Sequence, residues 1–206
     1  MDRFGNAVSQ TQTVRDWFGS GIVVDGYGRI VIITTSLRAK SNSDILAEQL
    51  LAGAKDAGHD AELISLKGKE IRYCIGCLAC QKTQRCIQKD DAIAIADKVL
   101  HADTLVFVTP IYYYEMSGQM KTLLDRLNPL YSADYRFRSV YLLSTAAEDE
   151  DFVPEKAVSG LQGWVDCFEK AELTGSLFCG GLTAGGEAAK AKAHLKAAYE
   201  FGRALR

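Results

Sequence analysis

Hydrophobic residues recur along the chain in two alternating patterns. Short continuous runs rich in Val, Ile and Leu are typical of strands that are buried on both faces of a sheet. Between these runs, apolar residues recur roughly every third or fourth position, which predicts amphipathic helices. The runs predict strands at 29–36, 60–66, 103–110, 138–145 and 173–181, and the periodic segments predict helices at 41–59, 90–102, 117–130 and 154–171, followed by an alanine-rich helix.

Regular alternation of strand and helix predicts one α/β domain with a parallel sheet and right-handed crossovers. We expect a flavodoxin-like three-layer sandwich, in which a five-stranded sheet of order 2-1-3-4-5 has helices on both faces. The domain is assigned to 29–206, and 1–28 to an N-terminal extension with a hairpin signal at Asp25-Gly26. Ligands of this fold bind beyond the carboxyl ends of the strands where the strand order reverses, which directs attention to the loops after the first and third strands.

Composition and charge exclude several classes of partner. The 206 residues carry a net charge of −2, so neither nucleic acid nor an anionic membrane is an expected partner. No apolar run approaches the ~20 residues of a spanning helix, and the first residues lack the apolar centre of a secretory signal. We therefore expect a cytoplasmic protein with reduced thiols, in which Cys167 and Cys179 are small core residues.

The loop after the first strand, "TSLRAKSNS" at 35–43, is rich in hydrogen-bonding side chains and leads into a helix. Unsatisfied N–H groups at a helix start attract anions, and an arginine fork suits phosphate oxygens. The loop therefore predicts a phosphate site, although serine and asparagine are also common in turns and caps, and Ser43 is the expected N-cap. Neither the Walker nor the dinucleotide glycine pattern occurs. The candidate phosphate ligands are Ser36, Arg38, Ser41, Asn42 and Ser43.

The loop after the third strand begins with "TPIYYYEMSG". Pro110 is expected to end the strand, and Tyr112, Tyr113 and Tyr114 follow it on the loop. Tyrosine offers a flat apolar face and a polar tip, so this loop is suited to flank a planar ring. The alternative is a subunit interface, where exposed tyrosines are also common.

Four cysteines with the spacing C-x2-C-x2-C-x5-C lie close together at Cys74, Cys77, Cys80 and Cys86. The compact start is similar to ferredoxin ligation of an iron–sulfur cluster, although Ile87 stands where ferredoxins have proline. Zinc sites with four cysteines usually consist of two separated pairs, which disfavours zinc. Free thiols, a redox-active pair and a cluster all remain open.

Taken together and in this order, "SLRAKSNS", the four cysteines followed by "DD", and "TPIYYYEMSGQMKTLLDR" resemble the flavodoxin-like NADPH-dependent FMN reductase family, in particular its iron–sulfur flavoproteins. The resemblance implies an FMN whose phosphate lies in the first loop and a [4Fe–4S] cluster on the four cysteines. It also implies a third flavin loop, "STAAEDED", whose acidic run departs from what is expected beside a phosphorylated flavin. The implied contacts of the flavin ring are Pro110, Ile111, Tyr112, Tyr113, Thr145 and Ala146.

The function implied by the resemblance is an FMN-dependent NAD(P)H oxidoreductase. The flavin carries the chemistry, no side chain is a dedicated catalytic group, and electrons pass to a small acceptor such as a flavin, a quinone or an electron carrier. One alternative is an iron–sulfur flavoprotein that transfers single electrons through FMN and a [4Fe–4S] cluster. Another is a flavin-binding module without turnover. The family layout and the tyrosine loop suggest a homodimer or homotetramer.

Overall fold

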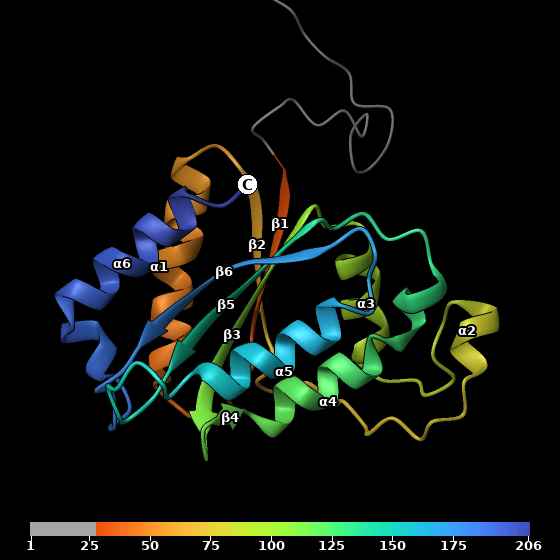
Figure 1. Cartoon of the computed structure of the whole chain (residues 1–206), viewed down its shortest axis with the longest axis horizontal. Helices are drawn as coiled ribbons and strands as arrows, with labels where there is room; N and C mark the ends of the chain where they lie inside the picture. Colours follow the sequence, from red (N-terminus) through yellow and green to blue (C-terminus); the bar gives the residue numbers. More distant parts are fainter. Residues whose placement is uncertain (1–27) are drawn as a thin grey trace, which may run out of the picture.

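A central parallel sheet organises the structure, a computed structural model that describes residues 28–206 (Figure 1). Its strands follow the order β2-β1-β3-β5-β6. This is the predicted flavodoxin-like order 2-1-3-4-5 when the five parallel strands are counted along the chain and β4, which pairs only with β3, is left out. All neighbours along this path are parallel. The strands are β1 (Arg29–Thr34), β2 (Asp60–Ser65), β3 (Thr104–Tyr112), β5 (Ser139–Thr145) and β6 (Glu172–Cys179).

Helices cover both faces of this sheet, as expected (Figure 1). One layer holds α1 and α6, and the opposite layer holds α3, α4 and α5. The short helix α2 lies at the periphery beyond α3 and α4 (Figure 1). The helices are α1 (Asn42–Asp56), α2 (Ala79–Thr83), α3 (Ala92–Leu100), α4 (Gly118–Arg126), α5 (Glu155–Val165) and α6 (Lys192–Arg203), with 3-10 turns η1 (Asn128–Ser132) and η2 (Glu187–Lys190).

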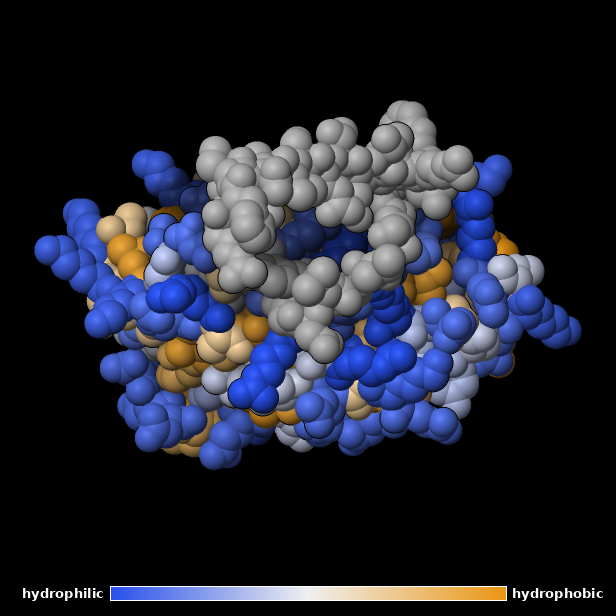
Figure 2. Space-filling view, turned by 90° about the horizontal axis from the view of Figure 1, so that it is seen from above, coloured by the Kyte–Doolittle hydropathy of each residue, from blue (hydrophilic) through white to orange (hydrophobic). Residues whose placement is uncertain are grey.

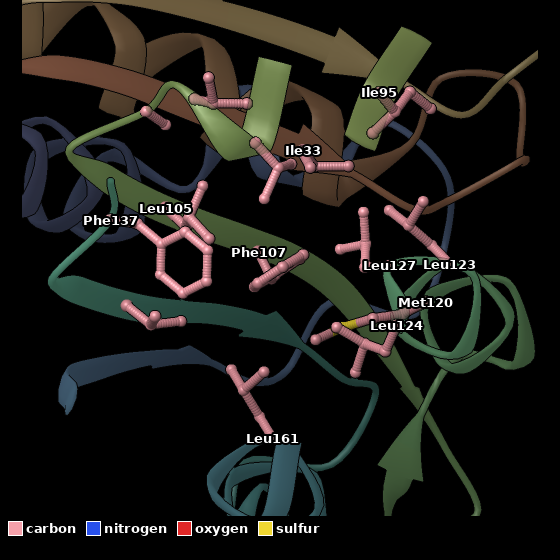
Figure 3. Packing of buried hydrophobic residues seen from close by; sticks show 14 of the residues in the cluster. Ile33, Ile95, Leu105, Phe107, Met120, Leu123, Leu124, Leu127, Phe137 and Leu161 are labelled. Atoms are coloured by element: carbon pink, nitrogen blue, oxygen red, sulfur yellow. The ribbon is translucent and has the colours of Figure 1, made fainter. Parts of the chain in front are cut away.

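Alternation along β1 divides the core into its two layers. Val31 and Ile33 face the α3–α4–α5 side, whereas Ile30 and Ile32 face α1 and α6, and all four side chains are fully buried. On the first side, Phe107 of β3 lies among leucines of α4 and α5 (Figure 3). Such burial on both faces explains why the strands appear in the sequence as uninterrupted apolar runs.

Helices α1 and α6 approach each other at two glycines. A Cβ on Gly53 would lie 2.0 Å from the carbonyl oxygen of Tyr199, and one on Gly202 would lie 2.0 Å from that of Leu50. Any larger residue would force the two backbones apart. This contact fixes α1, whose first turn borders the candidate site.

The third strand differs from the prediction, because β3 continues past Pro110 to Tyr112. Proline lacks a backbone N–H, and this is tolerated at Pro110 because β1 no longer runs beside it. Strand β1 ends at Thr34, whose partner on β3 is Val108. A two-residue turn, Tyr113–Tyr114, then leads into β4 (Glu115–Met116), which pairs antiparallel with the end of β3. The tyrosines therefore belong to a hairpin rather than to an open loop.

Smaller differences concern Cys167 and the helix ends. Cys179 is buried as predicted, but Cys167 is exposed because α5 ends at Val165, short of the predicted boundary. The Asp25-Gly26 hairpin signal lies outside the described residues. No described helix is long and apolar enough to cross a membrane. Seen from the amino-terminal edge of the sheet, the uncovered surface is mostly hydrophilic with small separate apolar patches (Figure 2).

Candidate functional site

The β1–α1 loop, residues 35–43, ends in the first turn of α1 at the carboxyl edge of the sheet. The N-cap is Ser41 rather than Ser43, and its hydroxyl accepts a hydrogen bond from the N–H of Asp44 at 3.1 Å. No described residue accepts a hydrogen bond from the backbone N–H groups of residues 39–43. Lys40 has a φ of 53°, a left-handed conformation that helps to form an anion-binding concavity of N–H groups. The loop therefore presents a row of free donors at a positive helix end.

The side chains of this loop are mostly engaged with the protein. The buried Asn42 donates to the carbonyl oxygen of Ala184 at 2.9 Å, and its own carbonyl accepts from the N–H groups of Gly186 and Ala188. The exposed Arg38 donates to the carbonyl oxygen of Thr183 at 2.8 Å. Asn42 thus anchors the loop after β6, while Arg38 keeps further N–H groups for a ligand.

The glycine-rich loop after β6 packs directly against the β1–α1 loop. A Cβ on Gly185 would lie 3.2 Å from the Lys40 carbonyl oxygen and 3.3 Å from Arg38 Nε. The loop after β6 was not among the loops predicted from the sequence to form the site. The glycine-rich run "CGGLTAGGE" could have indicated that this loop packs against the site, because glycine is needed where a backbone approaches closely.

Two buried hydroxyl pairs connect the β1–α1 loop with the other predicted loops. Ser43 Oγ lies 2.8 Å from Thr145 Oγ1 at the end of β5. Thr35 Oγ1 lies 3.0 Å from Oγ of Ser117, the N-cap of α4. Ser36 is also buried, and its hydroxyl accepts from the N–H of Arg38 at 3.4 Å. The structure therefore brings the three predicted loops together at one edge of the sheet.

A pocket of about 190 Å³ lies between the β3–β4 hairpin and the loop after β5. It brings together three of the predicted ring contacts, Ile111, Tyr113 and Ala146. Pro110 and Thr145 are neighbours in the sheet register but do not line it, and Tyr112 is half exposed beside it. Enclosed ligand pockets usually measure ~300–1,000 Å³, so this pocket would hold one edge of a planar ring and leave a face open.

Tyr114 and Glu148 also line this pocket but were absent from the predicted contacts. The Tyr114 hydroxyl interacts with Glu148, and this hydrogen bond, together with the negative charge, raises the pKa of Tyr114. Its ring stacks on Phe152 at 5.9 Å between centroids, and Lys156 Nζ lies 5.8 Å from the ring centre. Glu148 therefore connects the acidic run to the hairpin. The repeated tyrosines could have suggested Tyr114, whereas nothing in the sequence singled out Glu148.

The four cysteines lie apart from these loops, between β2 and α3. Cys74 and Cys77 are exposed, Cys80 is buried and Cys86 is partly buried, and all are free thiols. Within residues 28–206, no three His, Cys, Asp or Glu side chains form a group that could hold a metal. The four thiols as arranged therefore do not fit a cluster. A larger groove, of about 1250 Å³, runs beside Cys86 along α3 and η1, and none of the predicted flavin contacts lines it.

Known structures share this architecture. The fold matches an NAD(P)H:quinone oxidoreductase from Methanothermobacter marburgensis with a TM-score of 0.70 and 19% identity, covering 86% of this chain and 95% of that one. An azoreductase from Bacillus anthracis matches with a TM-score of 0.63 and 18% identity, covering 86% and 99%. At these identities the likeness concerns the fold, which is a flavodoxin-like α/β sandwich.

Sequence comparison gives the family. Residues 29–152 match the NADPH-dependent FMN reductase family, and the chain belongs to it. Similar relatives include an iron–sulfur flavoprotein from Archaeoglobus fulgidus, 40% identical over 48% of this chain and 49% of that protein. Another from Methanosarcina thermophila is 23% identical over 75% and 82%. The matched part spans about half the length of the first of these relatives.

Proposed function

We propose that the protein is an FMN-dependent NAD(P)H oxidoreductase that passes electrons to a small acceptor such as a flavin, a quinone or an electron carrier. The main support is the row of free backbone N–H groups at residues 39–43. Buried hydroxyl pairs link the loop that bears them to the loops around an apolar pocket. An anion seat beside an apolar, tyrosine-flanked pocket suits a molecule with a phosphate at one end and a planar ring at the other. Family membership supports FMN as that molecule.

In the proposed binding mode, one loop binds the phosphate of FMN and the others contact its ring. The N–H groups of the β1–α1 loop bind the phosphate, with Arg38 supplying a fixed positive charge and the Ser36 and Ser41 hydroxyls further donors. Ile111 and Tyr113 support one edge of the ring, and Ala146 leaves space beside it. Bound FMN supplies the hydride-accepting chemistry. The chain positions the ring and keeps one face open, and none of the described side chains is assigned as a general base.

Anaerobic reduction of the FMN-loaded protein tests this function. We expect FMN to bind stoichiometrically, NADH or NADPH to bleach its absorbance, and an added flavin or quinone to restore it. Comparing acceptors would identify the preferred one. FMN that stays oxidised with both nucleotides would contradict the oxidoreductase assignment and would favour a flavin-binding module without turnover.

The second candidate is an iron–sulfur flavoprotein that transfers single electrons. The close sequence relatives with this name and the four cysteines support it. If this function holds, anaerobically isolated protein contains iron and sulfide in amounts matching a four-iron cluster. Isolation without iron, followed by failed reconstitution under reducing conditions, would count against it.

We also propose that the protein forms a homodimer or homotetramer. Tyr113 is 98% exposed and Tyr112 is 50% exposed at the hairpin tip. Exposed tyrosines of this kind are frequent in interfaces. Light scattering on the eluted protein would show an oligomer, and Tyr113→Ser should weaken it if the hairpin forms the contact. A monomer at all working concentrations would contradict the proposal.

A further inference from the structure

The apolar pocket beside the β3–β4 hairpin has two walls, which come from different parts of the chain. The hairpin supplies Ile111, Tyr113 and Tyr114, and the loop after β5 supplies Ala146, Ala147, Glu148 and Val153. Strands β3 and β5 pair as far as Pro110 and Thr145, and beyond these residues the sheet no longer joins the two walls. The width of the pocket therefore depends on other contacts.

The base of the hairpin wall is fixed to the fold. The N–H of Ser117 donates to Thr109 Oγ1 at 3.1 Å, which closes the hairpin onto β3. Met116 of β4 is buried against α5, where a Cβ on Gly160 would lie 3.0 Å from its terminal methyl carbon. The hairpin is thus held between the sheet and α5.

The opposite wall is fixed to the loop after β6. The carbonyl oxygen of Ala146 accepts from the N–H of Leu182 at 2.8 Å, and that of Glu148 accepts from the N–H of Gly181 at 3.2 Å. A Cβ on Gly180 would lie 2.5 Å from the Glu148 carbonyl oxygen, so the close approach requires glycine there. Glu148 therefore stands on a firmly held backbone.

The tip of the hairpin, by contrast, has a strained backbone. Tyr113 and Tyr114 have φ values of 53° and 66°, whereas two-residue turns of this kind usually use asparagine and glycine. Such conformations are costly for other residues and persist only where the surroundings impose them. Tyr113 is 98% exposed and cannot supply that constraint.

Tyr114 supplies the constraint through its side chain. Its hydroxyl is hydrogen-bonded to Glu148, its ring stacks on Phe152, and Lys156 Nζ lies over the ring. All three partners follow β5 in the chain and lie on the far side of the pocket from the hairpin base. The strained tip is therefore tied to the opposite wall by this one side chain.

We propose that Tyr114 is a positioning residue that ties the two walls of the pocket together and so sets the width available to the edge of a planar ring. By fixing the turn, it also holds Tyr113 at the mouth of the pocket. The inference rests on the proposed function, because it assigns this pocket to the ring of FMN. Within the tie, the hydrogen bond to Glu148 is the contact that the loss of a single oxygen atom removes.

Binding of riboflavin, which lacks the phosphate, tests the ring side of the site alone. Tyr114→Phe keeps the stacked ring but loses the hydroxyl, and it should weaken riboflavin binding about three- to tenfold, as the loss of one hydrogen bond does. Tyr131→Phe makes the same chemical change on η1, outside the pocket, and should leave the affinity unchanged. Equal riboflavin affinities of the two variants in fluorescence titrations would overturn the proposal.

Two further readouts separate positioning from a general loss of structure. Inorganic phosphate should compete with FMN equally well in wild type and Tyr114→Phe, because the phosphate seat lies in another loop. The visible circular dichroism of bound FMN, which reports the surroundings of its ring, should change in Tyr114→Phe and not in Tyr131→Phe. A matching loss of phosphate affinity, or an unchanged spectrum, would contradict a positioning role.

Variants of Glu148 test whether the hydrogen bond or the charge matters. Glu148→Gln keeps an acceptor oxygen without the charge, so it should bind riboflavin nearly as wild type does. Glu148→Ala should resemble Tyr114→Phe, and combining the two substitutions should add no further loss, because they remove the same contact. If Glu148→Gln weakened binding as much as Glu148→Ala, the charge would be responsible and the tie would be refuted.

Failure of this inference differs from failure of the proposed function. Wild-type protein that binds neither FMN nor riboflavin would overturn the proposed function, and the assignment of the pocket with it. Wild-type protein that binds and reduces FMN, with Tyr114→Phe unchanged in every readout, would overturn the role of Tyr114 alone.

Discussion

The β1–α1 loop and the cysteine segment are both rich in groups that can bind a cofactor, but they are supported in opposite ways. In the loop, Ser36, Ser41, Asn42 and Ser43 are buried and each is hydrogen-bonded within the fold. In the cysteine segment, residues 72–90, the buried Arg126–Asp90 pair closes the base of the segment and Asn128 donates a hydrogen bond to Cys80. Residues 74–77 make no hydrogen bond with the described chain. The fold alone therefore completes the anion seat, whereas it leaves Cys74 and Cys77 exposed and without hydrogen bonds to the described chain.

Removing the buried Arg126–Asp90 pair, which closes the base of the cysteine segment, should have the largest effect. Asp90→Ala would leave Arg126 as an uncompensated buried charge, and breaking such a pair costs about 3–5 kcal/mol. Denaturant unfolding measures this loss. The matched control is Asp125→Ala, which breaks the exposed Lys121–Asp125 pair and should cost no more than about 0.5 kcal/mol. Similar losses in both variants would show that the base is not a fixed anchor.

The same pair predicts a pH dependence. Burial alone would raise the pKa of Asp90, but hydrogen bonds from Arg126 and from the backbone of Arg72 lower it below its ordinary value. A lowered pKa contributes stability above the ordinary value of about 3.9, and this contribution is lost as the pH falls through the lower, folded-state pKa. Unfolding measured from neutral to acidic pH should therefore show an acid-sensitive component that Asp90→Asn lacks. Parallel curves for the two proteins would refute it.

On the other side of the comparison, Arg38→Ala should weaken FMN binding by about 1–3 kcal/mol, because a charge-assisted contact with the phosphate is lost. Arg38 is exposed, so the fold should be unaffected. Fluorescence titration gives the dissociation constant, and Arg85→Ala in the cysteine segment is the control. An FMN affinity unchanged by Arg38→Ala would remove Arg38 from the phosphate site.

Ser41→Ala tests the scaffold of the seat and should have the smallest effect on stability. Loss of an N-cap hydroxyl costs about 1 kcal/mol of unfolding free energy. Ser159→Ala on the exposed face of α5 should change it by less than about 0.5 kcal/mol. Thermal unfolding compares the two, and equal stabilities would show that another group caps α1.

The sequence predicted the sheet well because its strands are buried on both faces and therefore form apolar runs such as "RIVIIT". It missed β4, which has only two residues, and the turn before it, because Tyr113 and Tyr114 adopt positive φ values that non-glycine residues rarely show. The N-cap of α1 was misplaced by two residues, from Ser41 to Ser43, since several serines offered similar signals.

The candidate site could be predicted from the sequence only in part, for a different reason. Its loops were predicted from strand order, but their mutual contacts join residues far apart in the chain, such as Asn42 with Ala184 and Tyr114 with Glu148. The anchoring of Cys80 by Asn128 is of the same kind. Tertiary packing determines such pairs, and no local pattern encodes them.

The central claim is that the β1–α1 loop binds the phosphate of FMN. Its most direct test is to compare the affinities of FMN and riboflavin, which differ only in that phosphate, for the same protein. We expect FMN to bind at least about a hundredfold more tightly than riboflavin, because its phosphate accepts charge-assisted hydrogen bonds from N–H groups, and Arg38→Ala should reduce this difference in affinity. Equal affinities for the two flavins would contradict it.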